Sequence, residues 1–161
     1  MSELDNKALV RRFYNEFYGK KNTEAIDDIY AAGYVHHTPD VLGGQMDFYD
    51  FKKRGMDMLS AFPDCSREIE DQVAEGDRVV TRSVTRGTQT SDLPNLPARG
   101  RRIEVQSIVI NRIEDGKIVE GWESYDSLGM MMQLDVVHMV STLSRARHER
   151  GDVMPGMKWP E

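Results

Sequence analysis

Carboxylate and imidazole side chains most often carry protons in catalysis, and two short stretches of this sequence offer them beside aromatic residues. The first is a run of β-branched and aromatic residues, Lys117 to Tyr125, that ends at Asp126. Because successive side chains of a strand point to opposite faces, strict alternation places Trp122 and Asp126 on one face and Glu123 on the other. The pattern therefore singles out Asp126, beside an indole, as the first candidate for chemistry.

Asp126 also has a structural interpretation. Residues 127–134 have the apolar spacing of a short helix. Aspartate is a favoured N-cap, because its side-chain oxygen accepts backbone N–H groups at the start of a helix. Spacing alone favours the cap over a catalytic role for this residue.

The second stretch is the adjacent pair His36 and His37, in an extended segment at 34–39. Adjacent side chains of such a segment point to opposite faces, and no Cys or further His stands at a supporting spacing, so we predict no metal site. At most one of the two faces a given cavity, where an imidazole can exchange a proton near neutral pH. A surface or hydrogen-bonded histidine is the alternative.

Length and composition describe one ordinary domain. The chain has 161 residues, of which 39% are hydrophobic and 30% charged, and its net charge is −6. The basic residues are scattered rather than gathered in a stripe, which argues against a nucleic-acid partner. No apolar run approaches the roughly 20 residues of a membrane span, so we predict no membrane contact.

The expected location is the cytoplasm. The N-terminus does not resemble a signal peptide. The single cysteine, Cys65, excludes an internal disulfide and fits a reducing compartment. We interpret it as a structural residue rather than a nucleophile or metal ligand.

Hydrophobic periodicity changes along the chain from the helical repeat to the alternation of strands. Residues 90–100 carry two prolines and no apolar periodicity, which predicts a loop that could cover a cavity mouth. The predicted helices and strands, in chain order, are helices at 6–18, 23–32 and 47–62, strands at 66–75, 78–89, 105–113 and 117–125, and a helix at 127–134.

The Asp-Gly pair at 115–116 is a strong hairpin signal between two strand-like runs. A two-residue loop sets Val109 opposite Trp122, whereas a three-residue loop sets Ile108 opposite it. We favour the second, because Glu-Asp-Gly-Lys suits a type I turn closed by a glycine bulge. Only that choice places Gln106 on the face of the carboxylate that ends the strand.

The order of elements predicts an α+β domain. Three helices, two antiparallel hairpins and a short closing helix suit a curved antiparallel sheet that wraps around the N-terminal helices as a cone with an open end. We place this domain at residues 1–134. Residues 135–161 form a C-terminal extension, helical at 136–147, that packs on the same or a partner subunit.

Several short motifs occur in an order and spacing typical of one protein family. They are LVRRFY at 9–14, YVHHTP at 34–39, AFPD at 61–64, EGDRVV at 75–80, and the stretch 112–126 followed by Leu-Gly at 128–129. None of them is diagnostic alone. Together, over residues 6–134, they resemble the SnoaL-like polyketide cyclase family of the nuclear-transport-factor-2-like superfamily.

The resemblance implies a mostly apolar internal pocket and a reaction that needs no metal or organic cofactor. Asp126 matches the family's aspartate on the final strand, which serves as general acid and base, and it can be the helix cap as well. His37 matches the histidine of the family's Tyr-Val-x-His-x-Pro segment, although Thr38 replaces the acidic residue often found next. Homodimers and homotetramers are common in the family.

For the reaction, the resemblance implies intramolecular aldol closure of a small hydrophobic polyketide. Asp126 removes a proton alpha to a carbonyl or ester, and His37 or Gln106 donates a hydrogen bond to the developing enolate. The alternatives are a related isomerase, dehydratase or hydrolase, or a noncatalytic small-molecule-binding protein. The candidate wall residues, each with plain core packing as its alternative, are Trp122, Tyr34, Phe13, Phe17, Phe62, Tyr14 and Phe51.

Overall fold

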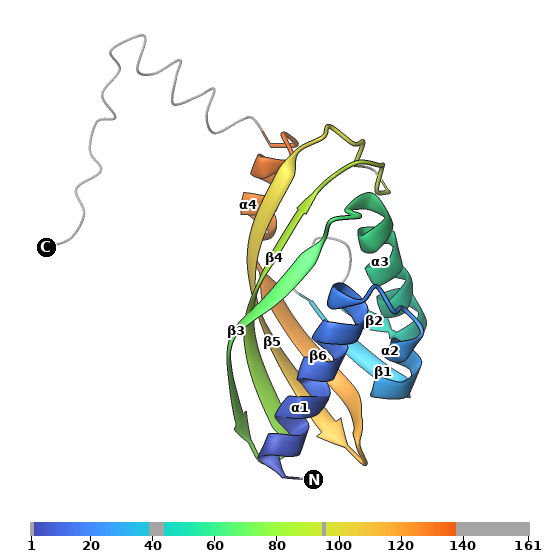
Figure 1. The fold of residues 1–161 in the computed structure, drawn as a ribbon, viewed down its shortest axis with the longest axis vertical. Coiled ribbons are helices and arrows are strands. Elements are labelled where there is room, and N and C mark those ends of the chain that lie inside the picture. The colour runs from blue at the N-terminus through green and yellow to red at the C-terminus, as the bar shows by residue number, and fades with distance from the viewer. Residues whose placement is uncertain (1, 39–43, 95, 138–161) are drawn as a thin grey trace, which may run out of the picture.

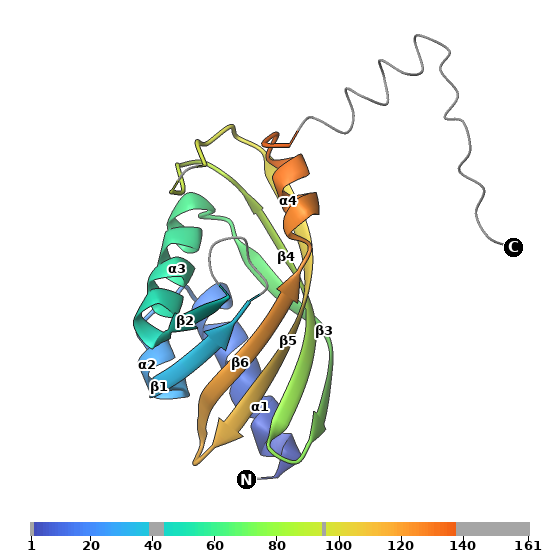
Figure 2. The same cartoon turned by 180° about the vertical axis from the view of Figure 1, so that it is seen from behind.

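The computed structural model describes residues 2–38, 44–94 and 96–137. These residues form one curved, unclosed sheet of six strands in the order β2-β1-β6-β5-β4-β3. Helices α1, α2 and α3 pack on one face of it, and α4 lies at one end (Figures 1 and 2). The strands are β1 Tyr30–His37, β2 Gln45–Asp47, β3 Ser66–Glu75, β4 Arg78–Thr88, β5 Arg102–Glu114 and β6 Lys117–Tyr125. The predicted α+β architecture is confirmed.

The first helix begins at a capping box. Ser2 Oγ accepts the Asp5 N–H at 3.2 Å, and the Asp5 carboxylate accepts the Ser2 N–H at 2.9 Å. Helix α1, Glu3–Phe13, then continues into a π-helical turn, Tyr14–Gly19. Such widened turns recur at functional sites, and this one carries aromatic side chains toward the sheet.

The second predicted helix is too long. Helix α2 spans only Ala25–Ile29, and the chain then enters strand β1 at Tyr30, so Gly33 lies inside a strand instead of ending a helix. Strand β1 pairs in parallel with β6, far along the chain. That tertiary pairing overrides the local helical periodicity of this segment.

The third helix and the first hairpin follow the sequence closely. Helix α3, Phe48–Ala61, is capped by Asp47, whose Oδ1 accepts the Asp50 N–H at 2.9 Å. Strand β3 has the predicted bounds, and β4 ends one residue earlier than predicted. The closing helix α4, Ser127–Gln133, is also present.

The β5–β6 hairpin has a register that neither sequence alternative contains. Asp115 and Gly116 have φ of 49° and 76°, which defines a two-residue turn with both residues left-handed. The favoured three-residue loop is therefore wrong. A bulge then leaves Val119 without a partner, and Ile110 lies opposite Trp122.

The bulge exchanges the two faces of β6 beyond Val119. Ile118 is buried before it and Gly121 after it, which breaks the strict alternation of the strand. Glu123 therefore faces the helices, and Trp122 faces away from them, the reverse of the sequence prediction. One additional residue thus decides which carboxylate faces the interior.

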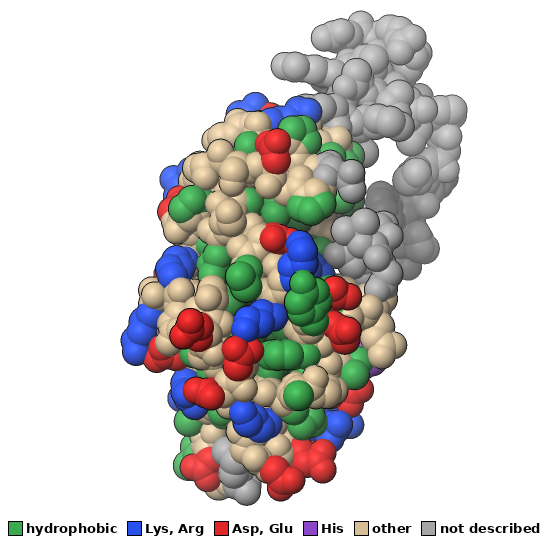
Figure 3. Space-filling view, turned by 90° about the vertical axis from the view of Figure 1, so that its right-hand side faces the viewer, with side chains coloured by type: hydrophobic (Ala, Val, Ile, Leu, Met, Phe, Trp, Pro, Cys, Tyr) green, Lys and Arg blue, Asp and Glu red, His purple; other side chains and the backbone are tan. Residues whose placement is uncertain are grey.

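The surface carries charges of both signs, interspersed with patches of hydrophobic side chains (Figure 3). No helix among the described residues is long and apolar enough to cross a membrane. The predicted C-terminal extension begins at residue 135, and the described residues end at 137. Nearly all of the extension, with its predicted helix at 136–147, therefore lies outside the described residues.

Candidate active site

A cavity of about 510 Å³ lies between the helices and the inner face of the sheet. Its helix side combines the apolar side chains of Phe13, Phe17, Phe51 and Met58 with charged residues of α3, namely Asp50, Lys53, Arg54 and Asp57. Its sheet side is formed by inward-facing residues of the strands and carries a second set of polar groups. A cavity of this size suits a small organic ligand with a large apolar surface and a few oxygen atoms.

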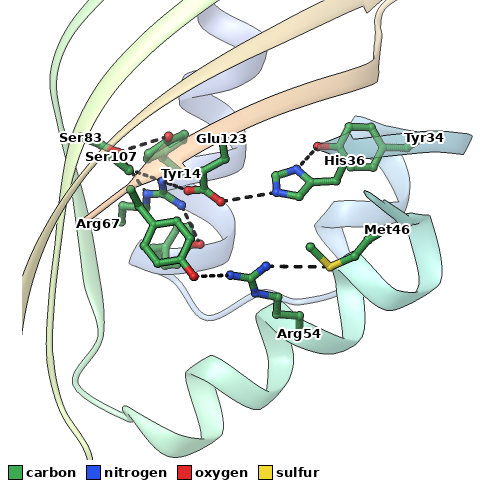
Figure 4. Close-up of polar contacts among 11 residues, drawn as sticks. Tyr14, Tyr34, His36, Met46, Arg54, Arg67, Ser83, Ser107 and Glu123 are labelled. Atoms are coloured by element: carbon green, nitrogen blue, oxygen red, sulfur yellow. Dashed lines mark hydrogen bonds and ion pairs between the residues drawn. The ribbon is translucent and has the colours of Figure 1, made fainter. Parts of the chain in front are cut away.

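Arg67 of β3 is the centre of a polar cluster on the sheet side (Figure 4). Its Nη2 donates to Glu123 Oε1 and to Ser107 Oγ, both at 2.5 Å. Its Nε donates to Ser83 Oγ at 3.1 Å, and its Nη1 to Tyr18 Oη at 3.3 Å. Only 10% of the Arg67 side chain and 14% of the Glu123 side chain are exposed.

Opposing effects act on the two charges of this buried pair. Burial raises the pKa of Glu123, but the charge of Arg67 and the hydrogen bond from His36 outweigh it and hold that pKa well below its usual range. Burial lowers the pKa of Arg67, but Tyr14 and Glu123 outweigh it and hold that pKa well above its usual value. Both side chains therefore stay ionised at neutral pH.

His36 connects this ion pair to a buried hydroxyl. Its Nδ1 lies 2.9 Å from Tyr34 Oη and its Nε2 lies 3.5 Å from Glu123 Oε2. The residue is 3% exposed and lines the cavity, with its ring centre 4.9 Å from that of Phe51. The imidazole thus has one nitrogen at a hydroxyl and the other near a carboxylate, all three on the cavity wall.

His37 points to the other face of the sheet. Its Nε2 lies 2.9 Å from Glu120 Oε1, and its ring stacks on Trp122 at 5.2 Å. The guanidinium of Arg78 lies over the same indole at 5.5 Å. Neither His37 nor Trp122 lines the cavity, although both were predicted as site residues.

Asp126 is exposed and caps α4. Its Oδ1 accepts the Gly129 N–H at 2.8 Å, and its own N–H donates to the carbonyl of Gln106 at 3.2 Å. The cap inferred from sequence is confirmed. Asp126 and Gln106 are both absent from the lining of the cavity.

The predicted wall residues divide into two groups. Phe62 is fully buried in a second apolar cluster with Cys65 and does not line the cavity, and neither does Trp122. Five predicted residues line the cavity, namely Phe13, Phe17, Tyr14, Tyr34 and Phe51. They come from the first helix with its π-helical turn, from β1 and from α3.

Three residues of the polar cluster, His36, Glu123 and Arg67, were not predicted as site residues from the sequence. A signal for His36 was present, because Tyr34 and His36 are two residues apart in one extended segment and so share a face. No local signal could have found the pair of Arg67 and Glu123, which are 56 residues apart.

No group of three or more His, Cys, Asp and Glu side chains among residues 2–38, 44–94 and 96–137 is arranged to hold a metal ion. The polar cluster on the sheet side consists instead of a guanidinium, a carboxylate, an imidazole and several hydroxyls. Their chemistry is that of proton transfer and hydrogen bonding.

Solved structures with the same fold include proteins from several bacteria. IdmH of Streptomyces antibioticus, described provisionally as a polyketide cyclase, is 28% identical, with a TM-score of 0.71 over 81% of this chain and 99% of that one. A protein of Acidithiobacillus ferrooxidans with the same provisional description is 27% identical, with a TM-score of 0.68 over 81% and 94%. AclR of Streptomyces galilaeus, described provisionally as a hydroxylase, is 24% identical, with a TM-score of 0.75 over 85% and 100%.

Among curated proteins, the search found no match. The family model for SnoaL-like polyketide cyclases matches residues 8–134, which include every strand of the sheet and every residue of the polar cluster. The order of the motifs, the curved sheet and this match all indicate the same family. The chain belongs to the SnoaL-like polyketide cyclase family.

Proposed function

We propose that this protein is an acid–base enzyme that closes a ring of a polyketide in the cavity by an intramolecular aldol reaction, with His36 as the proton carrier. The observation that supports it is the buried group of His36, Glu123 and Arg67 on the wall of a cavity that is also lined by many aromatic side chains. The family supports the substrate class. The homodimer or homotetramer and the cytoplasmic location stay predictions.

In the proposed reaction, His36 takes a proton from a substrate carbon alpha to a carbonyl group. The resulting enolate carbon attacks a second carbonyl of the same molecule and forms the new C–C bond. His36 then returns its proton to the alkoxide oxygen that this attack creates. Protons and charge balance within the substrate and the imidazole, so no oxidant, reductant or second substrate is needed.

Glu123 supports this role as a charge partner rather than as the base. Its strongly lowered pKa makes it a weak base, but keeps it negatively charged at neutral pH. A carboxylate 3.5 Å from Nε2 stabilises the imidazolium that forms when His36 takes up a proton. Imidazole is also the side chain best suited to gain and lose a proton near neutral pH.

Most of the rate enhancement in this proposal comes from the shape of the cavity. Holding a flexible chain in a reactive conformer contributes up to roughly 7–11 kcal/mol. A general base contributes about 100- to 10,000-fold in rate. The aromatic side chains that line the cavity provide an apolar surface against which such a chain can fold.

Exchange of α protons for deuterium tests the proton-transfer step without knowledge of the natural substrate. The probe is 2-tetralone, a bicyclic aromatic ketone with acidic α protons, followed by NMR in D₂O. We expect the wild-type protein to accelerate exchange, and His36→Gln to lower that rate about 100-fold or more. Aromatic polyketide methyl esters, followed by chromatography, then test ring closure.

Two matched variants separate this proposal from the assignment based on family resemblance. His37→Gln changes the neighbouring histidine, which faces away from the cavity, and Asp126→Asn changes the α4 cap. Both are expected to keep exchange rates within about twofold of wild type per folded molecule. Loss of exchange in Asp126→Asn with activity retained in His36→Gln would transfer the catalytic role to the aspartate.

A further inference from the structure

Asn111 of β5 is a polar residue of the cavity wall that the proposed reaction leaves without a role. It faces inward beside Val109 and is 4% exposed. Its partner across the hairpin is Gly121 of β6. The side chain therefore lies on the same wall as the polar cluster, toward the hairpin turn.

The side-chain amide of Asn111 has no hydrogen-bond partner among the described residues. The hydroxyls of Thr81 and Ser83 on β4 and of Ser107 on β5, which are also buried, are all hydrogen-bonded. A buried amide without a partner is costly, so native proteins satisfy such groups with protein, water or ligand atoms. Asn111 lines the cavity, so a ligand there can supply the partner.

Gly121 brings Asn111 close to the proposed proton carrier. A Cβ built on Gly121 would lie 3.3 Å from Asn111 Oδ1 and 2.4 Å from Tyr34 Oη, so both side chains cross over the same glycine. Tyr34 Oη in turn lies 2.9 Å from His36 Nδ1. Asn111 Oδ1 and Tyr34 Oη thus both lie over Gly121, and Tyr34 Oη also contacts the imidazole.

We propose that Asn111 donates its amide N–H to the carbonyl oxygen of the substrate whose α carbon lies at His36. The oxygen and the α carbon of a ketone are two bonds apart, which fits two groups that flank one hydroxyl. As the proton leaves, the negative charge moves to that oxygen, and a preorganised donor in an apolar cavity stabilises it. The inference rests on the proposed function, because it assigns the electrophilic partner of the same reaction.

Asn111 in this role also selects the ligand. A ketone or ester satisfies the amide, whereas a hydrocarbon of the same shape leaves it unpaired. The substrate therefore carries a carbonyl oxygen on the side that meets β5, and an apolar surface where it meets Phe13, Phe17 and Phe51.

The test compares two ligands that differ by this oxygen, 2-tetralone and tetralin, by calorimetry. In Asn111→Leu, which has similar size and no donor, we expect 2-tetralone to bind about tenfold more weakly and tetralin to change less than twofold. The matched control is Val109→Ala on the same wall, which removes only apolar contact and is expected to weaken both ligands by the same factor. Asn111→Leu is also expected to lower the exchange rate at saturating 2-tetralone.

These measurements keep the two proposals apart. His36→Gln is expected to retain the preference for 2-tetralone over tetralin, because binding does not require proton transfer. Loss of exchange from Asn111→Leu without loss of that preference would overturn the inference. Equal weakening of both ligands by Asn111→Leu, or binding of neither ligand to the wild-type protein, would also overturn it.

Discussion

His36 and His37 are neighbours in β1 and each lies beside a glutamate of β6, but the two pairs are on opposite faces of the sheet. The side chains of the inner pair, His36 and Glu123, are 4% and 14% exposed. Those of the outer pair, His37 and Glu120, are 31% and 26% exposed, although their contact is shorter, 2.9 Å against 3.5 Å. The same two residue types therefore occur in a dry and in a wet setting.

The difference shows that surroundings, rather than the distance within a pair, determine what a histidine and a glutamate can do. Inside, the carboxylate is held by Arg67 and opens onto a cavity. Outside, Glu120 accepts from His37 and Arg112, which lower its pKa against a smaller effect of burial. Water screens the outer charges, so this pair contributes little to the free energy of folding and has little effect on a reacting group.

Of the substitutions considered for the two pairs, removal of the inner carboxylate is expected to have the largest effect on stability. Glu123→Gln leaves the Arg67 guanidinium buried without its anionic partner, at a cost of about 3–5 kcal/mol in the free energy of unfolding. Urea unfolding at neutral pH measures this loss. A loss no larger than that of a surface pair would show that water reaches Arg67 freely.

The pH dependence of stability provides the control for Glu123→Gln. Because the pKa of Glu123 is lower in the folded than in the unfolded chain, the pair stabilises the protein above the unfolded pKa of about 4.3, and this contribution is lost as the pH falls below it. The gap between wild type and Glu123→Gln is therefore expected to narrow steadily below about pH 4. A constant gap would assign the loss to packing instead.

Gly121 affects the inner histidine through packing rather than charge, because it lies against Tyr34, the neighbour of His36. Gly121→Ala would place a methyl group 2.4 Å from Tyr34 Oη, whereas a Cβ at Gly33, in strand β1, meets no atom within 4 Å. We expect Gly121→Ala to cost about 1–3 kcal/mol of stability. It should also move Tyr34 away from His36 and slow the exchange of 2-tetralone.

Gly33→Ala is the matched control, since both glycines lie in strands and neither has a positive φ. Its stability and exchange rate are expected to equal those of the wild type. Equal effects of the two substitutions would show that Tyr34 can move aside without disturbing the imidazole.

Much of the fold was predictable because it depends on short-range patterns. Helix α3 begins after an aspartate cap and ends just before Pro63, β3 has the predicted bounds, and Asp126 caps α4 as its residue type suggests. Each of these signals lies within a few residues of the element that it defines.

The inner face of the site was not predictable by the same means. The bulge at Val119 depends on how β6 pairs with β5, and it moved Glu123 inward against the alternation of the sequence. Strand β1 pairs with β6, far along the chain, and no local pattern signals this pairing. The helix predicted for the first residues of β1 is therefore wrong. Family resemblance pointed instead to Asp126 and His37, which are the more solvent-exposed residues of the two stretches.

Substitution in the outer pair, His37 and Glu120, is expected to have the smallest effect on stability. Glu120→Gln removes contacts to His37 and Arg112 at the surface, and unfolding in urea is expected to stay within about 1 kcal/mol of wild type. Added salt should shrink even that difference, because it screens exposed charges. The exchange rate of 2-tetralone should not change. A loss comparable to that of Glu123→Gln would mean that the two faces are energetically coupled through β6, and that burial alone does not distinguish them.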